Sequence, residues 1–138
     1  MLETALRKDA LTITAAGFEL RVGLPWIRSM PLSSVSGLAV EIDGGRTPQA
    51  DLSVMLGDRR VAAEKLPKER AWWFIQDRLV LAGGCRLEPG VHAVSVDFQL
   101  LVPYLQARPG SPLVLPFHLE AQLDTRRPSA ATASRDVA

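Results

Sequence analysis

The sequence holds two histidines, His92 and His118, and one cysteine, Cys85, residue types that can bind metals or, in the case of cysteine, act as a nucleophile. A catalytic zinc site usually takes three protein ligands drawn from His, Cys and carboxylates. A cysteine becomes a nucleophile when its pKa is lowered and a general base lies beside it. No histidine is near Cys85 in the sequence, so a thiol in a turn is the favoured interpretation. We therefore expect no catalytic residue and no metal site in this chain taken alone.

The two histidines fall at different places in the alternation of their strands. His92 shares the parity of the apolar Val94, which predicts a histidine at the edge of the core. His118 shares the parity of the polar residues of its strand, which predicts a position in solvent or at an interface. The glycine pairs 44–45 and 83–84 lack the P-loop and GxGxxG patterns and are read as turns.

Protein recognition is the function that the remaining features favour. The stretches LPWIRSMPL (24–32) and VPYLQARPGSPL (102–113) are bracketed by prolines, which stiffen them, so their aromatic and arginine side chains lose little entropy on docking. In WWFI (72–75) both faces of a strand would be apolar, so a partner or a loop of the same chain must cover one of them. We expect a partner interface or substrate-pocket rim formed by Pro25, Trp26, Ile27, Arg28, Met30, Trp73, Tyr104 and Arg108.

The elements that would position these residues are strands. Apolar residues alternate with polar ones over 18–24, 38–42, 91–102 and 113–123. The Asp-Gly-Gly turn at 43–45 predicts a hairpin that pairs 38–42 with 51–56. Residues 61–70 predict a short helical turn that Pro67 ends, and 72–75 and 79–81 predict two short strands.

Short strands at intervals of about ten residues are typical of an antiparallel sandwich or barrel. We predict a single all-β domain, an antiparallel β-sandwich of about seven to nine strands, over residues 1–124. The tail 125–138 has almost no apolar side chain larger than alanine, so we expect it to be disordered.

Composition limits the classes of partner. Sixteen basic and fifteen acidic residues give a formal charge of +1 among 138 residues, which recommends neither a nucleic acid nor an anionic membrane. The single cysteine fits a reducing compartment, and no signal peptide or membrane span is evident. A cytoplasmic location is the expectation.

The order of several blocks resembles a known family. The strand FELRV, the stretch LPWIRSMPLSSVSGLAVEIDG, the central WWF and the block LEPGVHAVSVDFQLLVPYL together resemble the small β subunit of bacterial C-glycoside deglycosidases, over roughly residues 15–123. The sequence departs from the family pattern at Trp26-Ile27, where two aromatic residues are common. It also carries a basic tail after Asp124.

The resemblance implies a β-sandwich subunit bound to a larger α subunit with a TIM barrel similar to sugar isomerases and a divalent metal, Mn or Mg. Together the subunits would cleave the carbon–carbon bond of a 3-oxo-C-glycoside, with the substrate at the interface of the two chains, and the lyase chemistry would be carried by the α subunit. The alternative hypothesis is a free-standing β-sandwich that binds carbohydrate, in which Trp26, Trp72 or Trp73 stacks on a sugar.

Overall fold

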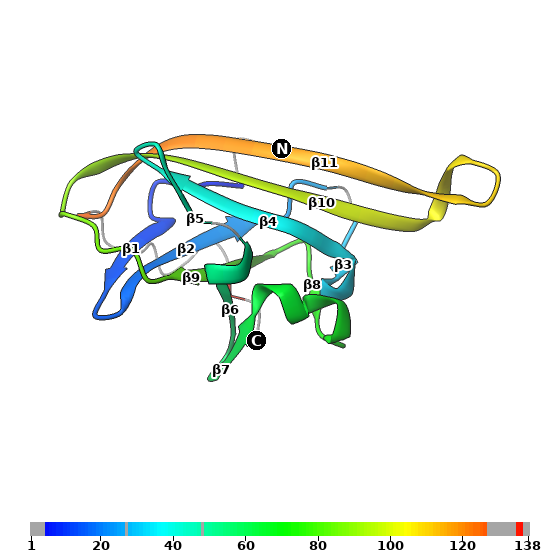
Figure 1. Cartoon of the computed structure of the whole chain (residues 1–138), viewed down its shortest axis with the longest axis horizontal. Helices are drawn as coiled ribbons and strands as arrows, with labels where there is room; N and C mark the ends of the chain where they lie inside the picture. The colour runs from blue at the N-terminus through cyan, green and yellow to red at the C-terminus, as the bar shows by residue number, and fades with distance from the viewer. Residues whose placement is uncertain (1–4, 27, 48, 127–134, 137–138) are drawn as a thin grey trace.

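The computed structural model describes residues 5–26, 28–47, 49–126 and 135–136, with the backbone alone for 103–107 and 135–136. Its strands form two sheets that pack face to face, and a short two-stranded ribbon lies at one end (Figure 1). Every strand pair among the described residues is antiparallel except one. The predicted fold class, an all-β sandwich, is confirmed. The described residues form twelve strands, more than the seven to nine predicted, because several are only two to four residues long.

The first sheet is built around the strand that is buried most completely, β9. Every residue of β9 is buried, because strands flank it and the second sheet packs over one face. Besides the strands, the described residues form three short 3₁₀ helices: η2 (Leu32–Ser34), η3 (Gln49–Asp51) and η4 (Ala63–Lys68). The strands of the first sheet, in spatial order, are β1 (Leu11–Thr14), β2 (Gly17–Gly23), β9 (Asp77–Gly83), β6 (Ser53–Leu56) and β7 (Arg59–Ala62).

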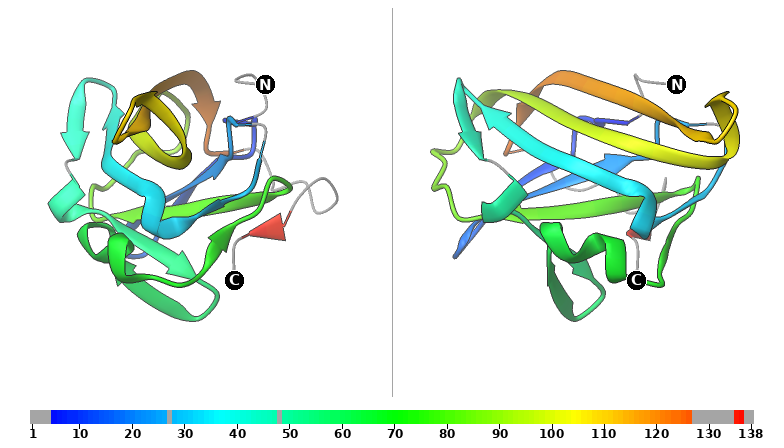
Figure 2. Two further views of the ribbon diagram at one scale, coloured as in Figure 1. Left: turned by 90° about the vertical axis from the view of Figure 1, so that its right-hand side faces the viewer. Right: turned by 45° about the vertical axis from the view of Figure 1, so that its right-hand side comes forward.

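The second sheet is dominated by one long hairpin, which runs along a whole side of the molecule, opposite β9, β6 and β7 (Figure 2). The spatial order of its strands is β11 (Ser111–Asp124), β10 (Val91–Arg108), β4 (Val35–Ile42) and β5 (Gly45–Thr47). The ribbon at the end of the sandwich pairs β3 (Met30–Pro31) with β8 (Trp72–Trp73).

The core lies between the inner faces of the two sheets. Phe18, Leu20 and Val22 of β2 face it from one side, and Val96, Phe98 and Leu100 of β10 from the other, all 2% exposed or less. The alternation read from the sequence for these strands is therefore confirmed. The partly buried residues of β11 extend the same apolar layer towards the tip of the hairpin.

The predicted pairing of 38–42 with 51–56 is wrong. The turn at Asp43-Gly44 does reverse the chain, but β4 pairs with the three-residue β5. After β5 the chain turns through η3, where the Gln49 side-chain oxygen accepts a hydrogen bond from the Leu38 N–H at 3.0 Å. β6 then enters the first sheet between β9 and β7. The helical turn predicted within 61–70 is confirmed as η4, although Pro67 lies inside it.

The predicted tail begins at Thr125, which is held against Gly90 by backbone and side-chain hydrogen bonds. Arg135–Asp136 form β12, which pairs in parallel with the start of β9. Residues 127–134 and 137–138 lie outside the described residues, so the disorder expected of the tail stays a prediction. Among the described helices, none has the length and apolar character needed to cross a membrane.

Gly17 marks a close approach between the β1–β2 hairpin and the end of β9. Its φ is +151°, and a Cβ at this position would lie 2.1 Å from the Gly83 carbonyl oxygen. Backbone atoms cannot rotate away as a flexible side chain can. The position therefore requires glycine for both its conformation and its space.

We expect Gly17→Ala to lower the free energy of unfolding by about 3 kcal/mol, because an unfavourable φ and overpacking each cost roughly 1–3 kcal/mol. Gly57→Ala is the matched control: Gly57 also has a positive φ, +64°, but no atom lies within 4 Å of its Cβ position. Its cost should be about 1 kcal/mol. Urea unfolding measures both, and equal losses would show that the close approach does not matter.

Candidate partner interface

Four aromatic side chains form a continuous series from the core to the end of the sandwich. The Trp73 ring packs on Phe98 with centroids 5.7 Å apart, Phe98 stacks on Phe117 at 5.4 Å, and Phe117 meets the edge of Trp26 at 6.4 Å. Trp73 is 1% exposed, and its indole N–H donates to the Asp77 carbonyl at 3.2 Å. The series thus ties the β3–β8 ribbon and the loop after β2 to the long hairpin.

Trp26 is half-buried, and Pro25 before it is buried. The Trp26 indole N–H is enclosed and has no hydrogen-bond partner among the described residues. An enclosed donor without a partner costs roughly 1–3 kcal/mol, so packing against Phe117 must offset that cost. The bulk of LPWIRSMPL therefore serves the chain's own packing at Trp26, whatever else the loop contacts.

The structure separates the residues predicted for the interface into three groups. Pro25, Met30 and Trp73 are buried and have little or no surface to offer a partner. Met30 and Trp73 are each 1% exposed, because both side chains point into the core from the β3–β8 ribbon. Arg28 and Arg108 are exposed, and Trp26 is partly so. Ile27 and the side chain of Tyr104 lie outside the described residues. For the residues with accessible surface, the interface role stays a prediction.

The exposed aromatic surface of this region belongs to the neighbours of Trp73. Trp72 is 46% exposed, Phe74 43% and Ile75 50%, and we call these three residues the β8 patch. The Trp72 and Phe74 rings stack with centroids 6.5 Å apart and an interplanar angle of 20°. The apolar run WWFI indicated two covered faces, but the sequence could not say which one faces the core; Trp73 was expected outside and lies inside.

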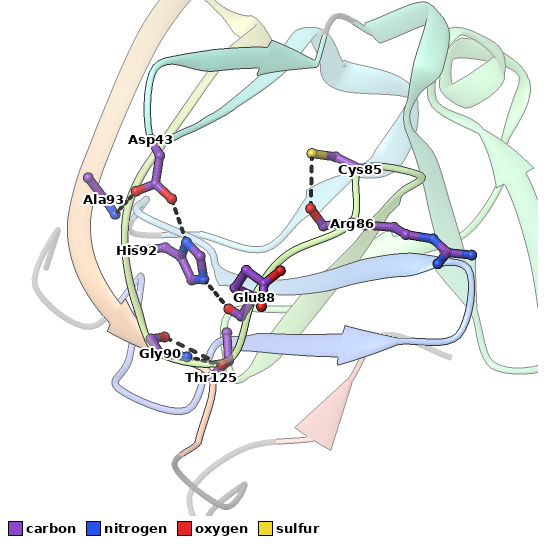
Figure 3. A network of polar contacts seen from close by, with 8 residues as sticks. All are labelled: Asp43, Cys85, Arg86, Glu88, Gly90, His92, Ala93 and Thr125. Carbon is purple, nitrogen blue, oxygen red and sulfur yellow. Dashed lines mark hydrogen bonds and ion pairs between the residues drawn. The ribbon is translucent and has the colours of Figure 1, made fainter.

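His92 is held at both ring nitrogens by acceptors (Figure 3). Nδ1 contacts a carboxylate oxygen of Asp43 at 2.5 Å, and Nε2 contacts the Glu88 carbonyl at 2.6 Å. The other Asp43 oxygen accepts from the Ala93 N–H at 2.9 Å. Because a carboxylate and a carbonyl oxygen can only accept, these contacts favour the imidazolium form of His92, in which both ring nitrogens carry hydrogen. The pair clasps the β4–β5 turn to the start of β10.

This clasp shifts both pKa values. The Asp43 carboxylate, and after it the Glu88 carbonyl, raise the pKa of His92 above its ordinary value. The His92 ring, and after it the Ala93 amide, lower the pKa of Asp43. The predicted position of His92 at the edge of the core is confirmed, since it is 8% exposed. The ring acts in holding the fold and has no nitrogen left for a substrate or a metal.

His118 lies on the outer face of the second sheet, as its parity predicted. Its Nδ1 contacts Asp97 at 2.6 Å and its Nε2 contacts Glu120 at 2.7 Å. Glu120 and then Asp97 raise the pKa of His118. The ring borders a shallow hollow of about 470 Å³, which Glu41, Ser95 and Glu120 also line. Because each ring nitrogen is paired with its own carboxylate, the three groups do not converge on a common point.

The described part of the chain contains no group of three or more His, Cys, Asp or Glu side chains placed to hold a metal ion. Cys85 is exposed, and its sulfur lies 3.8 Å from the Arg86 carbonyl oxygen. Among the surface features described above, the apolar β8 patch is therefore the one whose residue types are most typical of a binding surface.

The charge of His92 gives stability a pH dependence with a defined sign. A raised pKa in the folded state means that the contribution is fully present below the unfolded value of about 6.5 and is lost as pH rises through the folded pKa. As pH rises above about 6.5, we expect the wild-type unfolding free energy to fall more steeply than that of His92→Gln. Asp43→Asn, which tolerates the positive φ of this position, should flatten the curve in the same way.

His118→Gln serves as the control, because His118 is also paired with carboxylates but its side chain is 52% exposed, where ion pairs contribute little. Chemical denaturation over a pH series gives the slopes. Parallel curves for the wild type and His92→Gln would contradict the charged clasp.

Comparison with known proteins assigns the chain to a family. A model of the family described as C-glycoside deglycosidase beta subunit matches residues 3–104. The 3'-dehydrocarminate deglycosidase beta subunit of a Microbacterium species is 28% identical over 130 residues, covering 93% of this chain and 98% of that protein.

Two further relatives cover a smaller part of the chain. The C-glycoside deglycosidase beta subunit of Arthrobacter globiformis is 34% identical over 89 residues, 62% of this chain and 68% of that protein. That of Microbacterium trichothecenolyticum is 32% identical over 88 residues, 62% and 67% of the two chains. The resemblance seen in the sequence blocks is confirmed, and the chain belongs to the C-glycoside deglycosidase beta subunit family.

Proposed function

We propose that this chain is the noncatalytic beta subunit of a heteromeric C-glycoside deglycosidase that cleaves the carbon–carbon bond of a 3-oxo-C-glycoside. The observation that carries the proposal is the family match over residues 3–104, together with relatives that are named as beta subunits of deglycosidases. The name of the Microbacterium relative includes "3'-dehydro", which denotes a sugar oxidised at its 3' position. A 3-oxo sugar as substrate agrees with that name.

The chemistry explains why such a substrate must be oxidised. A C-glycoside has no glycosidic oxygen that an acid could protonate, so the route of ordinary glycosidases is closed. A ketone at C3 acidifies the hydrogen at C2. A base removes that hydrogen, and the electron pair forms a C1–C2 double bond while the bond from C1 to the aglycone carbon breaks. The aglycone leaves as a carbanion that is protonated in turn, so the reaction is a lyase elimination.

We assign this elimination to a partner, a TIM-barrel alpha subunit with a bound Mn or Mg ion. A metal in that subunit would polarise the sugar ketone. The donor set of this chain supports the division of labour, since His92 and His118 use both ring nitrogens on neighbouring acceptors. This chain would contribute an interface, through Arg28, Arg108 and the surface near them, at or beside the substrate entrance.

A carbohydrate-binding module is the second candidate, because the stacked Trp72 and Phe74 rings could lie against a sugar face. The two candidates differ in what the isolated chain binds. A beta subunit recognises protein, whereas a carbohydrate module binds sugar without a partner. Titration of the isolated chain with a 3-oxo-C-glucoside and with the unoxidised C-glucoside measures this property.

We expect the isolated chain to have no deglycosidase activity, and co-expression with the alpha subunit to give an active heteromer burying more than about 2,000 Å² in total, the size of obligate interfaces. Chelation should abolish the activity of the heteromer, and metal analysis of the separated chains should find the metal with the partner. Light scattering, an activity assay on a 3-oxo-C-glucoside and metal analysis test the proposal. A metal held stoichiometrically by this chain, or turnover by this chain alone, would refute the noncatalytic assignment.

A further inference from the structure

We propose that the β8 patch, Trp72, Phe74 and Ile75, is the surface that docks the partner subunit, and that the partner meets it with an apolar pocket surrounded by acidic side chains. The inference rests on the proposed function for the existence of a partner, and it names the surface that the partner covers. It also moves the centre of the interface from Trp73, which is buried, to its neighbours in the stretch 72–75, which were not among the predicted interface residues.

The patch is unusual because it exposes two stacked aromatic rings and an isoleucine within four consecutive residues. The other large apolar side chains exposed in the described structure are aliphatic residues of the long hairpin: Val91, and the cross-strand neighbours Leu101 and Val114. A few exposed aliphatic residues are ordinary on a protein surface, whereas clustered aromatic ones are typical of interaction sites. Tryptophan in particular is enriched among the residues that dominate binding energy.

The exposure of Trp72 follows from its place in the strand. Side chains alternate between the two faces of a strand, so a buried Trp73 places its strand neighbour Trp72 on the opposite side. Phe74 directly follows the strand and stacks on Trp72, and Ile75 is exposed in the turn that comes next. Trp73 fills part of the core between the sheets. If its side chain turned outward and that of a neighbour turned inward, a cavity would open in the core. The patch is therefore fixed by the packing of the domain.

The backbone that carries the patch is held at several points. β8 pairs with β3, with Trp72 opposite Pro31, and the Ala71 carbonyl accepts from the Leu32 N–H at 3.0 Å. The Ile75 N–H donates to the Ser29 hydroxyl at 2.8 Å, and the Asp77 N–H donates to the Phe74 carbonyl at 2.9 Å. A surface that is already ordered loses little conformational entropy when a partner covers it.

The charge around the patch indicates the character of the partner. The two segments that form the ribbon and its flanks, 24–33 and 70–76, contain Arg28 and Arg70 and no acidic residue. Both arginines are exposed. An apolar centre with basic residues at its margin is complementary to an apolar pocket with an acidic margin, because like charges opposed across an interface cost binding energy.

The same charge argues against a second copy of this chain as the occupant. A two-fold interface on the patch would place its arginines close to their own copies. The patch is also small: fully covered, two aromatic rings bury on the order of 150–250 Å² each, against about 800 Å² for one side of a stable complex. It therefore suits the centre of a larger interface with a different chain.

The test compares Trp72→Ala and Arg70→Glu with Val91→Ala, a control whose side chain is 57% exposed on the other sheet. The melting temperature of each variant is measured on the isolated chain. Its Kd is measured towards the partner, which is the protein that is encoded next to this chain and copurifies with it. We expect Trp72→Ala to weaken binding at least thirtyfold, and Arg70→Glu at least tenfold with a smaller salt dependence. Val91→Ala should stay within twofold, and all melting temperatures within about 3 °C.

Arg70→Glu keeps the aromatic rings, so it tests the surface even if Trp72→Ala proves unstable. Wild-type affinity in Arg70→Glu and in any folded Trp72 variant would overturn the inference while leaving the proposed function intact. If the wild-type chain binds no protein encoded beside it, both the inference and the proposed function are contradicted. An isolated chain that is a dimer by light scattering and becomes a monomer in Trp72→Ala would assign the patch to a second copy, and sugar binding lost in Trp72→Ala would assign it to carbohydrate; both results overturn the inference.

Discussion

The packing of Trp73 in the core fixes which face of the two-residue strand β8 is exposed. β8 lies at the end of the sandwich, and Trp73 packs on Phe98 and through it on Phe117. With Trp73 inside, its strand neighbour Trp72 faces outward, and the Trp72 ring stacks there on Phe74, which directly follows the strand. The same aromatic series holds Trp26 and the loop after β2. Stability of the domain and exposure of its main apolar surface therefore have a single origin.

Several polar side chains of the described residues hold the fold together through contacts within the chain. The buried pair of Arg78 with Asp9, at 3.0 Å, joins β9 to the segment before β1. The clasp of His92 with Asp43 joins the β4–β5 turn to the start of β10, and His118 contacts two carboxylates. These acceptors raise the pKa of each imidazole, and both nitrogens of each ring are engaged in contacts within the chain. A subunit that lends surface to a catalytic partner is consistent with such side chains.

The long strands could be predicted because each buries one face along its length, so that alternation is visible over five or more residues. The pairing of the strands could not be predicted in the same way. The turn at Asp43-Gly44 was found, but β4 pairs with the three-residue β5, and after η3 the chain continues as β6 in the other sheet. In the candidate site the sequence indicated an aromatic interface near 24–32 and 72–75. It could not tell Trp72 from Trp73, because a run of four apolar residues carries no alternation, and burial is decided by Phe98, a residue distant in the chain.

Hydrogen–deuterium exchange of this chain, free and bound to its partner subunit, tests most directly the claim that the apolar β8 patch is its functional surface. We expect slowed exchange in residues 70–76 on binding and unchanged exchange at Ser95 and Glu120, beside the polar hollow of the second sheet. Slowed exchange on that outer face, with none in residues 70–76, would contradict it.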